Sequence, residues 1–248
     1  MELTRFFTEH PKAAIAFSGG VDSAYLLYAA IRAGADVTAY CACTEFQPRF
    51  ELEDAMALAS SLGARLVFLR LSALEDETIA SNPENRCYFC KRRIFSAILK
   101  RAESDGYDLL LDGTNASDDL SQRPGSRALA ELSVRSPLLE AGLTKAEIRR
   151  LSREAGLPTW DKPAYACLAT RIPAGEPITR EALARTERAE SYLSSLGFRD
   201  FRVRTRGNGA LLQVRQEDLP LVLSRREEIV NTLKGDYVSV TLDLEVRP

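Results

Sequence analysis

The sequence predicts an α/β protein in which a parallel, doubly wound, Rossmann-like domain over residues 1–165 is followed by a smaller α+β domain over residues 166–248. In the first two-thirds of the chain, apolar strand patterns alternate with helix patterns, an order that builds a parallel sheet covered on both faces. In the last third, strands alternate apolar and polar residues, as when one sheet face is solvated. A length of 248 residues is enough for two modest domains.

The first strand and helix have clear patterns. Residues 13–18 (AAIAFS) have no polar face, which is typical of a strand buried on both sides. Residues 23–34 (SAYLLYAAIRAG) then predict a helix that ends at a glycine, and residues 37–43 (VTAYCAC) predict a second strand. Cys41 and Cys43 share one face of that strand, so we expect both to be core cysteines.

The alternation continues to residue 112. A helix over 51–63 begins with acidic residues and ends at a glycine, and the run at 65–70 predicts a third strand. A helix with a basic face is predicted over 88–104, and a fourth strand at 107–112 follows it. Strands joined through helices in this way predict a single parallel sheet.

A proline-rich stretch predicts the domain junction. Before it, Thr144 and Glu147 have the spacing of a capping box at a helix start, and Gly156 ends that helix. Residues 158–177 then contain four prolines and a glycine. We therefore expect the first domain to end within this stretch.

The last third of the chain predicts two helices and three strands around one sheet. Each strand alternates apolar and polar residues, and the second helix has the acidic start and Lys-Gly end that suit a helix dipole. The expected elements are a helix over 179–196, strands over 201–205 and 210–215 joined by a turn at 207–209, a helix over 217–235 and a strand over 237–246.

Composition excludes several function classes. The chain is 45% apolar and 27% charged, with a formal net charge of −2, which argues against wholesale coating of nucleic acid and against disorder. His10 is the only histidine, and we expect it to be a solvated surface residue. We therefore expect neither a Ser-His-Asp enzyme nor a multi-histidine metal site.

The cysteine count and hydropathy indicate a cytoplasmic protein without a membrane partner. Five cysteines are too few for a disulfide framework, and their odd number suits reduced thiols. No apolar run approaches ~20 residues, and the N-terminal stretch lacks the apolar core of a signal peptide.

The sharpest motif is SGGVDS at residues 18–23, between the first strand and its helix. Two glycines let the backbone approach an anion, and the N–H groups at a helix start favour negative charge. Asp22 could hold Mg²⁺ against phosphates. We predict a phosphate-binding loop whose ligands come from Ser18, Gly19, Gly20, Asp22 and Ser23.

A second stretch, Asp112-Gly113-Thr114-Asn115, follows the fourth strand, at the sheet edge where parallel sheets bind ligands. Gly113 would let the backbone approach the nucleotide closely. Asp118 and Asp119 fit a solvated acidic loop and a metal or substrate site equally well.

Three further cysteines carry a possible redox or metal function. Cys87 and Cys90 form a CxxC at a helix start rich in Arg and Lys, where a thiolate is favoured. The motif alone fits a redox pair, a metal site or a structural role. With Cys167 from the junction, three thiolates suit an iron–sulfur cluster with one iron left open.

Together these motifs resemble the LarE family of the ATP pyrophosphatase (PP-loop) superfamily. The resemblance rests on SGGVDS, on NRCYFCK at 85–91, on the DGTN and RPG residues of 112–125, on WDKPAYACLATRIP at 160–173 and on the FRVR strand. It spans nearly the whole chain and implies an adenine nucleotide alpha-hydrolase-like fold for the first domain.

The resemblance implies an ATP-dependent sulfur transferase in the synthesis of the nickel-pincer nucleotide. ATP and Mg²⁺ would adenylate a carboxylate of pyridinium-3,5-biscarboxylic acid mononucleotide, and a sulfur donor would displace AMP. In family members with only the junction cysteine, that cysteine gives up its sulfur and becomes dehydroalanine. In members that also carry the CxxC, the three cysteines hold a [4Fe-4S] cluster, and Cys87, Cys90 and Cys167 fit that type.

The second domain offers a substrate clamp. Arg202, Arg204 and Arg206 alternate along one strand, and guanidinium groups bind phosphates and carboxylates in pairs of hydrogen bonds. The family pattern assigns Arg202 and Arg204 to the substrate phosphate, whereas Arg206 follows from spacing alone. The resemblance also implies an active-site carboxylate at Glu190. The alternatives without a function are that the three arginines form a solvated sheet face and that Glu190 is a solvated acid on a helix.

Other activities remain open at this stage. A tRNA thiolase would share the loop and the adenylation, but residues 171–248 hold 13 basic and 12 acidic residues, which suits a polyanion poorly. A nucleotide sensor would bind ATP without releasing pyrophosphate. An amide-forming synthetase would need an ammonia source that the sequence does not indicate. We expect a small nucleotide substrate, a sulfide or other sulfur donor, and a homo-oligomer.

Overall fold

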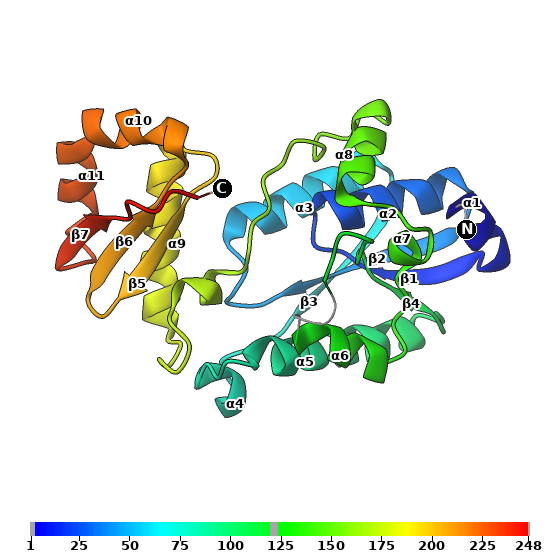
Figure 1. Cartoon of the computed structure of the whole chain (residues 1–248). Coiled ribbons are helices and arrows are strands. Elements are labelled where there is room, and N and C mark those ends of the chain that lie inside the picture. The colour runs from blue at the N-terminus through cyan, green and yellow to red at the C-terminus, as the bar shows by residue number, and fades with distance from the viewer. Residues whose placement is uncertain (1–2, 120–123, 248) are drawn as a thin grey trace. The chain divides into compact units, whose positions relative to one another are not determined.

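The computed structural model describes residues 3–119 and 124–247, and it shows two compact units (Figure 1). The first unit comprises Met1–Ser72 and Asn85–Lys162, and the second comprises Ala73–Glu84 and Pro163–Pro248. The sequence placed the boundary between residues 165 and 166, a few residues later, and did not anticipate that Ala73–Glu84 joins the second unit. Residues 120–123, which include part of the quoted family motif, lie outside the described residues.

The first unit is built on a parallel four-stranded sheet, which confirms the predicted α/β class. Its strands are β1 (Lys12–Ala16), β2 (Asp36–Cys43), β3 (Arg65–Arg70) and β4 (Leu110–Leu111), in the order β3-β2-β1-β4. The apolar run of β1 lies in the middle of the sheet because β2 and β4 pair with it on either side. The carboxyl end of β1 is therefore flanked by two strands, as a switch-point ligand site requires.

Helices cover both faces of this sheet (Figure 1). One face packs Ile15 and Ala39 against five helices, and the other packs Ala14 and Tyr40 against two. The first group is α1 (Leu3–Glu9), α2 (Val21–Arg32), α3 (Arg49–Ser61), α7 (Pro137–Glu140) and α8 (Lys145–Glu154); the second is α5 (Arg86–Ser104) and α6 (Pro124–Glu131).

Helix α8 begins with the predicted capping box. The Thr144 hydroxyl accepts a hydrogen bond from the Glu147 N–H at 3.3 Å, and the Glu147 carboxylate accepts one from the Thr144 N–H at 2.8 Å. Hydrogen bonds from Thr144 lower the pKa of Glu147 below its ordinary value. Gly156 ends the helix at φ +70°, a backbone conformation that favours glycine.

The second unit contains a three-stranded sheet beside helix α9 (Arg180–Ser195). The strands are β5 (Arg202–Arg206), β6 (Gly209–Gln213) and β7 (Ser239–Leu242); β5 pairs antiparallel with β6, and β6 pairs parallel with β7. Val203, Leu212 and Ile229 lie in its core. Its other elements are α4 (Glu77–Ala80), η2 (Leu168–Arg171), η3 (Gln216–Asp218), α10 (Leu219–Ser224) and α11 (Arg226–Leu233).

Two predicted elements of this unit differ from the structure. The helix expected over 217–235 is divided into η3, α10 and α11, and Pro220 stands in the first turn of α10, where a missing N–H favours a helix start over a helix interior. The strand expected over 237–246 pairs with β6 only over Ser239–Leu242. Val238 and Leu244 are consequently exposed rather than buried on a sheet face.

Ala73–Glu84 joins the second unit through hydrogen bonds to the segment after η2. The buried Asn82 amide donates to the carbonyls of Pro173 and Glu176 at 2.7 and 3.1 Å. The backbone N–H of Gly175 in turn donates to the Asn82 carbonyl at 2.8 Å. Among the described residues, no helix is both long and apolar enough to cross a membrane.

Candidate active site

The loop between β1 and α2 is closed on itself by its serines. The Ser23 hydroxyl lies 3.2 Å from the Ser18 hydroxyl, accepts a hydrogen bond from the Ser18 N–H and donates to the Gly20 carbonyl. Gly20 precedes α2 without a side-chain cap on the helix N–H groups. The start of α2 therefore presents backbone donors and the positive end of its dipole, an arrangement that binds anions.

Two glycines make this loop sterically feasible. Gly19 has φ +72°, and a Cβ on it would lie 2.9 Å from the Ala55 Cβ of α3. Gly113, after β4, lies so close to α2 that an added Cβ would be 2.9 Å from the Ser23 nitrogen and 3.2 Å from the Asp22 Cβ. The structure thus brings together the two stretches that the sequence selected, because they follow adjacent strands.

Asp22 is held between a cation and an amide. Its Oδ2 forms an ion pair with the ammonium group of Lys145, and its Oδ1 accepts a hydrogen bond from the Asn115 side chain at 3.2 Å. Sequence reasoning missed Lys145. The available signal was its place as the first residue of the capping-box helix, which follows the loops after β1 and β4 in the chain.

The acidic residues after β4 shape their own loop. Buried Asp112 accepts hydrogen bonds from the hydroxyls of Thr114 and Ser136 at 2.5 and 2.6 Å. The Asp118 carboxylate accepts one from the Asn115 N–H at 3.1 Å, which orders the residue that contacts Asp22. Over the described ranges 3–119 and 124–247, no group of three or more His, Cys, Asp or Glu is placed to hold a metal ion.

The cysteines occupy different environments. Cys41 lies in the core as predicted, and burial raises the pKa of its thiol to about 12, whereas Cys43 is only half-buried. Cys87 and Cys90 lie three residues apart in the first two turns of α5, so both thiols project from one side of that helix. Cys167 belongs to the second unit and immediately precedes η2.

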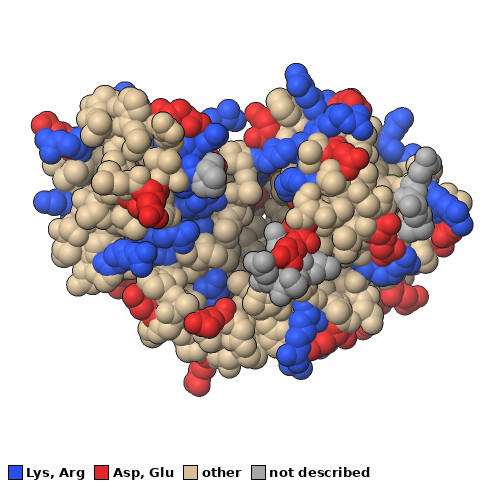
Figure 2. All heavy atoms as spheres, in the orientation of Figure 1, with Lys and Arg blue, Asp and Glu red and all other residues tan. Residues whose placement is uncertain are grey.

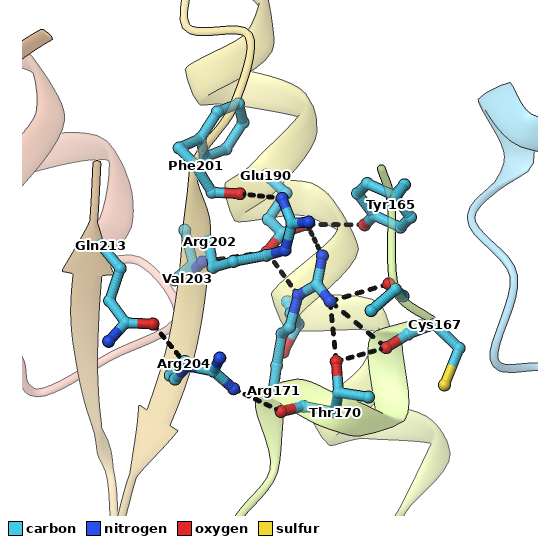
Figure 3. Close-up of polar contacts among 12 residues, drawn as sticks. Tyr165, Cys167, Thr170, Arg171, Glu190, Phe201, Arg202, Val203, Arg204 and Gln213 are labelled. Atoms are coloured by element: carbon cyan, nitrogen blue, oxygen red, sulfur yellow. Dashed lines mark hydrogen bonds and ion pairs between the residues drawn. The ribbon is translucent and has the colours of Figure 1, made fainter. Parts of the chain in front are cut away.

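Three arginines lie against one side of the segment that carries Cys167 (Figure 3). Arg202 donates to the Ala164 carbonyl at 2.6 Å, and Arg204 donates to the Thr170 carbonyl at 2.7 Å. Buried Arg171 donates to the Ala166 carbonyl at 2.7 Å and to the Cys167 carbonyl at 3.3 Å. The alternation of β5 thus places Arg202 and Arg204 beside the Cys167 segment, whereas Arg206 is exposed.

Glu190 of α9 is buried and paired with Arg171. Its two carboxylate oxygens accept hydrogen bonds from Arg171 Nε and Nη2 at 2.8 and 2.9 Å. Although burial opposes the charged form, Glu190 keeps the pKa of Arg171 above its ordinary value. Burial and the nearby Arg171 charge lower the pKa of both Arg202 and Arg204. The structure therefore places Glu190 beside the Cys167 segment but in contact with protein groups.

Comparison with known proteins shows relatives along almost the whole chain. An uncharacterised protein from Synechocystis is 39% identical over 247 residues, which are 98% of this chain and 92% of the relative. Pyridinium-3,5-bisthiocarboxylic acid mononucleotide synthase from Lactiplantibacillus plantarum is 35% identical over 233 residues, covering 93% of this chain and 84% of the synthase. The chain belongs to the LarE family. No family model matches it.

A more distant relative shares the superfamily. A tRNA-specific 2-thiouridylase from Desulforamulus reducens is 26% identical over 60% of this chain, and the chain spans about half the length of that relative. The parallel sheet and the loop between β1 and α2 agree with PP-loop membership. This LarE-family chain is therefore an enzyme of the PP-loop superfamily with a second, smaller sheet domain.

Proposed function

We propose that this LarE-family enzyme is an ATP-dependent sulfur transferase that acts on pyridinium-3,5-biscarboxylic acid mononucleotide. The observation that carries the proposal is the anion-binding loop at the start of α2, closed by Ser18 and Ser23 and packed against Gly113. The substrate class comes from the similarity of the whole chain to a synthase of the corresponding bisthiocarboxylic acid mononucleotide.

The chemistry follows from the low reactivity of a carboxylate, whose leaving group would be oxide. In the proposed reaction a carboxylate oxygen attacks the α-phosphorus of ATP, pyrophosphate leaves, and an acyl adenylate forms. A sulfur nucleophile then attacks the acyl carbon, and AMP leaves with the former carboxylate oxygen. No histidine base is required, because a thiolate or sulfide already carries its electron pair.

The first unit supplies the nucleotide site of this proposal. Ser18, Gly19, Gly20, Ser23 and Gly113 would bind the ATP phosphates, and Asp22 would hold Mg²⁺ against them. Asp22 is already neutralised by Lys145, so a Mg²⁺ ion would either displace the ammonium group or share the carboxylate with it. A carboxylate oxygen is a ligand type that Mg²⁺ prefers, which makes the donor chemistry compatible.

The second unit supplies the substrate anchor and Cys167. Among the described residues, Arg204 Nη2 has no hydrogen-bond partner, and Arg206 is exposed, so both side chains retain donors for a substrate phosphate. Arg202 donates to the Phe201 and Ala164 carbonyls instead. We therefore assign phosphate binding chiefly to Arg204 and Arg206, with Arg202 supporting the site.

Sulfur delivery has two forms in this family, and the three-cysteine form fits the donor set. Thiolates are the ligands that iron–sulfur clusters take, and Cys87 and Cys90 project from one side of α5. A [4Fe-4S] cluster held by Cys87, Cys90 and Cys167 would supply a sulfide from its open iron. In the single-use form, Cys167 Sγ would bond to the acyl carbon; loss of the Cα proton and cleavage of the Cβ–S bond would then leave dehydroalanine.

The decisive experiment supplies the enzyme with ATP, Mg²⁺ and the pyridinium nucleotide and measures AMP, pyrophosphate and thiocarboxylate together. We expect all three products from the native enzyme, and pyrophosphate without thiocarboxylate from Cys167→Ser. Cys43→Ser is the matched control and should form all three. Thiocarboxylate formation by Cys167→Ser would refute the assigned role of Cys167.

Metal analysis separates the two sulfur sources. Anaerobically prepared enzyme should contain about four irons and four sulfides per chain, and Cys87→Ala should lose them. Iron-free enzyme after anaerobic reconstitution would instead support single use. Mass spectrometry of Cys167 after one turnover would then detect the loss of H₂S. Light scattering of the same preparation tests the expected homo-oligomer.

The similarity to a tRNA thiouridylase makes RNA the alternative substrate. Basic and acidic side chains are intermixed on the face shown in Figure 2, and residues 171–248 carry a net charge of only +1. Such a surface offers little counterion release on binding a polyanion. Thiolated nucleosides in digests of tRNA incubated with enzyme and ATP would favour this alternative, and their absence would favour the small nucleotide.

A further inference from the structure

In the described part of the chain, the segment from Ala164 to Thr170 belongs to no strand. Backbone carbonyls that leave water need a hydrogen-bond donor, and here arginine side chains supply it. Arg202 donates a hydrogen bond to the Ala164 carbonyl, and Arg204 donates one to the Thr170 carbonyl. Arg171 donates to the two carbonyls between them, those of Ala166 and Cys167 (Figure 3). The Cys167 carbonyl also accepts hydrogen bonds from the Thr170 N–H at 3.0 Å and the Thr170 hydroxyl at 2.8 Å, so guanidinium groups act together with the turn of η2 to fix this backbone.

Arg171 is the centre of this arrangement. Its side chain is fully buried, and its Nη1 also donates to the Thr170 hydroxyl at 2.8 Å. That hydroxyl donates in turn to the Cys167 carbonyl at 2.8 Å. The Arg171 guanidinium also stacks over the Tyr165 ring at 4.6 Å. One side chain thus contacts the segment before, at and after Cys167.

The buried Glu190 carboxylate accepts hydrogen bonds from Arg171 and other protein groups rather than from solvent. Besides the two bonds from Arg171, its carboxylate accepts hydrogen bonds from the Tyr165 hydroxyl at 2.6 Å and from the Val203 N–H at 2.9 Å. A carboxylate offers about four acceptor positions, so these four bonds use them all. Glu190 has no acceptor position left for a substrate, and its geometry fixes the plane of the Arg171 guanidinium.

We propose that Arg171 is a positioning residue that holds the Cys167 backbone in place for sulfur transfer, and that Glu190 acts only by orienting Arg171. This inference rests on the proposed function, because it concerns the step in which Cys167 takes part. Adenylation uses the loop of the first unit, so the proposal separates two half-reactions. Loss of the arrangement should slow sulfur transfer while pyrophosphate release continues.

The test compares Arg171→Lys with Arg188→Lys, each made as a single substitution in the whole 248-residue chain. Lysine keeps the charge but loses the planar fork, so it cannot bond Glu190 and the Cys167 segment together. We expect sulfur transfer to fall by about 100-fold, the cost of displacing a reacting group by about 1 Å. Arg188 makes an equivalent two-bond pair with Asp236 on the surface of the same unit, and its variant should match the native enzyme.

Cysteine alkylation provides a readout that a general loss of stability would not give. Iodoacetamide labelling of iron-free enzyme, followed peptide by peptide, should become about tenfold faster at Cys167 in Arg171→Lys, because a released segment gains backbone freedom. Labelling at half-buried Cys43, which is no ligand of the proposed cluster, should not change in the same sample. Acceleration at both cysteines would indicate general unfolding and would overturn the proposal, as would native rates at both.

A milder variant covers the case in which Arg171→Lys does not fold. Thr170→Val removes only the hydroxyl that accepts a hydrogen bond from Arg171 and donates one to the Cys167 carbonyl. We expect the loss of these two bonds to slow sulfur transfer about 25-fold, about fivefold for each bond. Native sulfur transfer in Thr170→Val, or in folded Arg171→Lys, would overturn the positioning role alone. Native transfer in Cys167→Ser would instead refute the proposed function, so the two failures are distinguishable.

Discussion

Replacing Gly19 with alanine tests how tightly the loop between β1 and α2 packs on α3. Gly19 has φ +72°, and an alanine Cβ there would lie 2.9 Å from the Ala55 Cβ and 3.0 Å from the Ala55 Cα. Because two of the contacted atoms lie on or next to the backbone, the neighbour cannot simply rotate away. The loop or α3 must therefore move.

Gly156→Ala isolates the conformational part of that cost. Gly156 has nearly the same φ, +70°, but an added Cβ would meet nothing within 4 Å. The left-handed conformation costs about 1–2 kcal/mol in either variant. Overpacking adds about 1–3 kcal/mol to Gly19→Ala alone. We therefore expect Gly19→Ala to lower the free energy of unfolding by about 2–5 kcal/mol and Gly156→Ala by about 1–2 kcal/mol.

Urea denaturation at equilibrium, analysed with a common slope, measures both values. Isothermal titration with ATP should in addition show weaker binding for Gly19→Ala, because the displaced loop moves the N–H groups at the start of α2. ATP binding by Gly156→Ala should be native. Equal destabilisation of the two variants, or native ATP affinity in Gly19→Ala, would refute the argument from close packing.

Three further predictions follow from single groups. Asp22→Ala should abolish substrate-dependent pyrophosphate release, and unchanged release would move the Mg²⁺ role to another residue. Thr144→Ala should lower the free energy of unfolding by about 1 kcal/mol, which thermal denaturation can measure; an unchanged midpoint would show that the capping box does not stabilise α8. Because burial raises the pKa of the Cys41 thiol from 9.0 to about 12, the unfolded chain ionises first. Stability should thus fall between pH 9 and pH 12 by up to about 1.4 kcal/mol per pH unit, and a Cys41→Ala variant with the same slope would contradict this.

Local patterns predicted the elements around the loop between β1 and α2 well. The apolar run before SGGVDS identified β1 because a central parallel strand is buried on both faces. The Thr144 and Glu147 spacing located the start of α8 because a capping box is a contact within one turn. Gly113 could be linked to the loop because parallel strands place their carboxyl ends at one edge.

Contacts between distant residues could not be predicted in the same way. Asn82 holds carbonyls near residue 173, and no pattern around residue 82 marks that partner. Alternation put Arg202 and Arg204 on one face of β5, but the carbonyl groups that they bond belong to a segment without regular structure. The family resemblance predicted an active-site carboxylate at Glu190. Only the four hydrogen bonds in the structure show which groups its oxygens contact.

Oxygen-18 labelling of the substrate carboxylates tests the central claim of adenylation and sulfur transfer most directly. The native enzyme would be incubated with ATP, Mg²⁺ and labelled pyridinium nucleotide, and the label would be located by mass spectrometry. Displacement of AMP by sulfur predicts one labelled oxygen in AMP for each thiocarboxylate formed, with pyrophosphate unlabelled. Label in inorganic phosphate together with ADP, or thiocarboxylate formed beside unlabelled AMP, would contradict it.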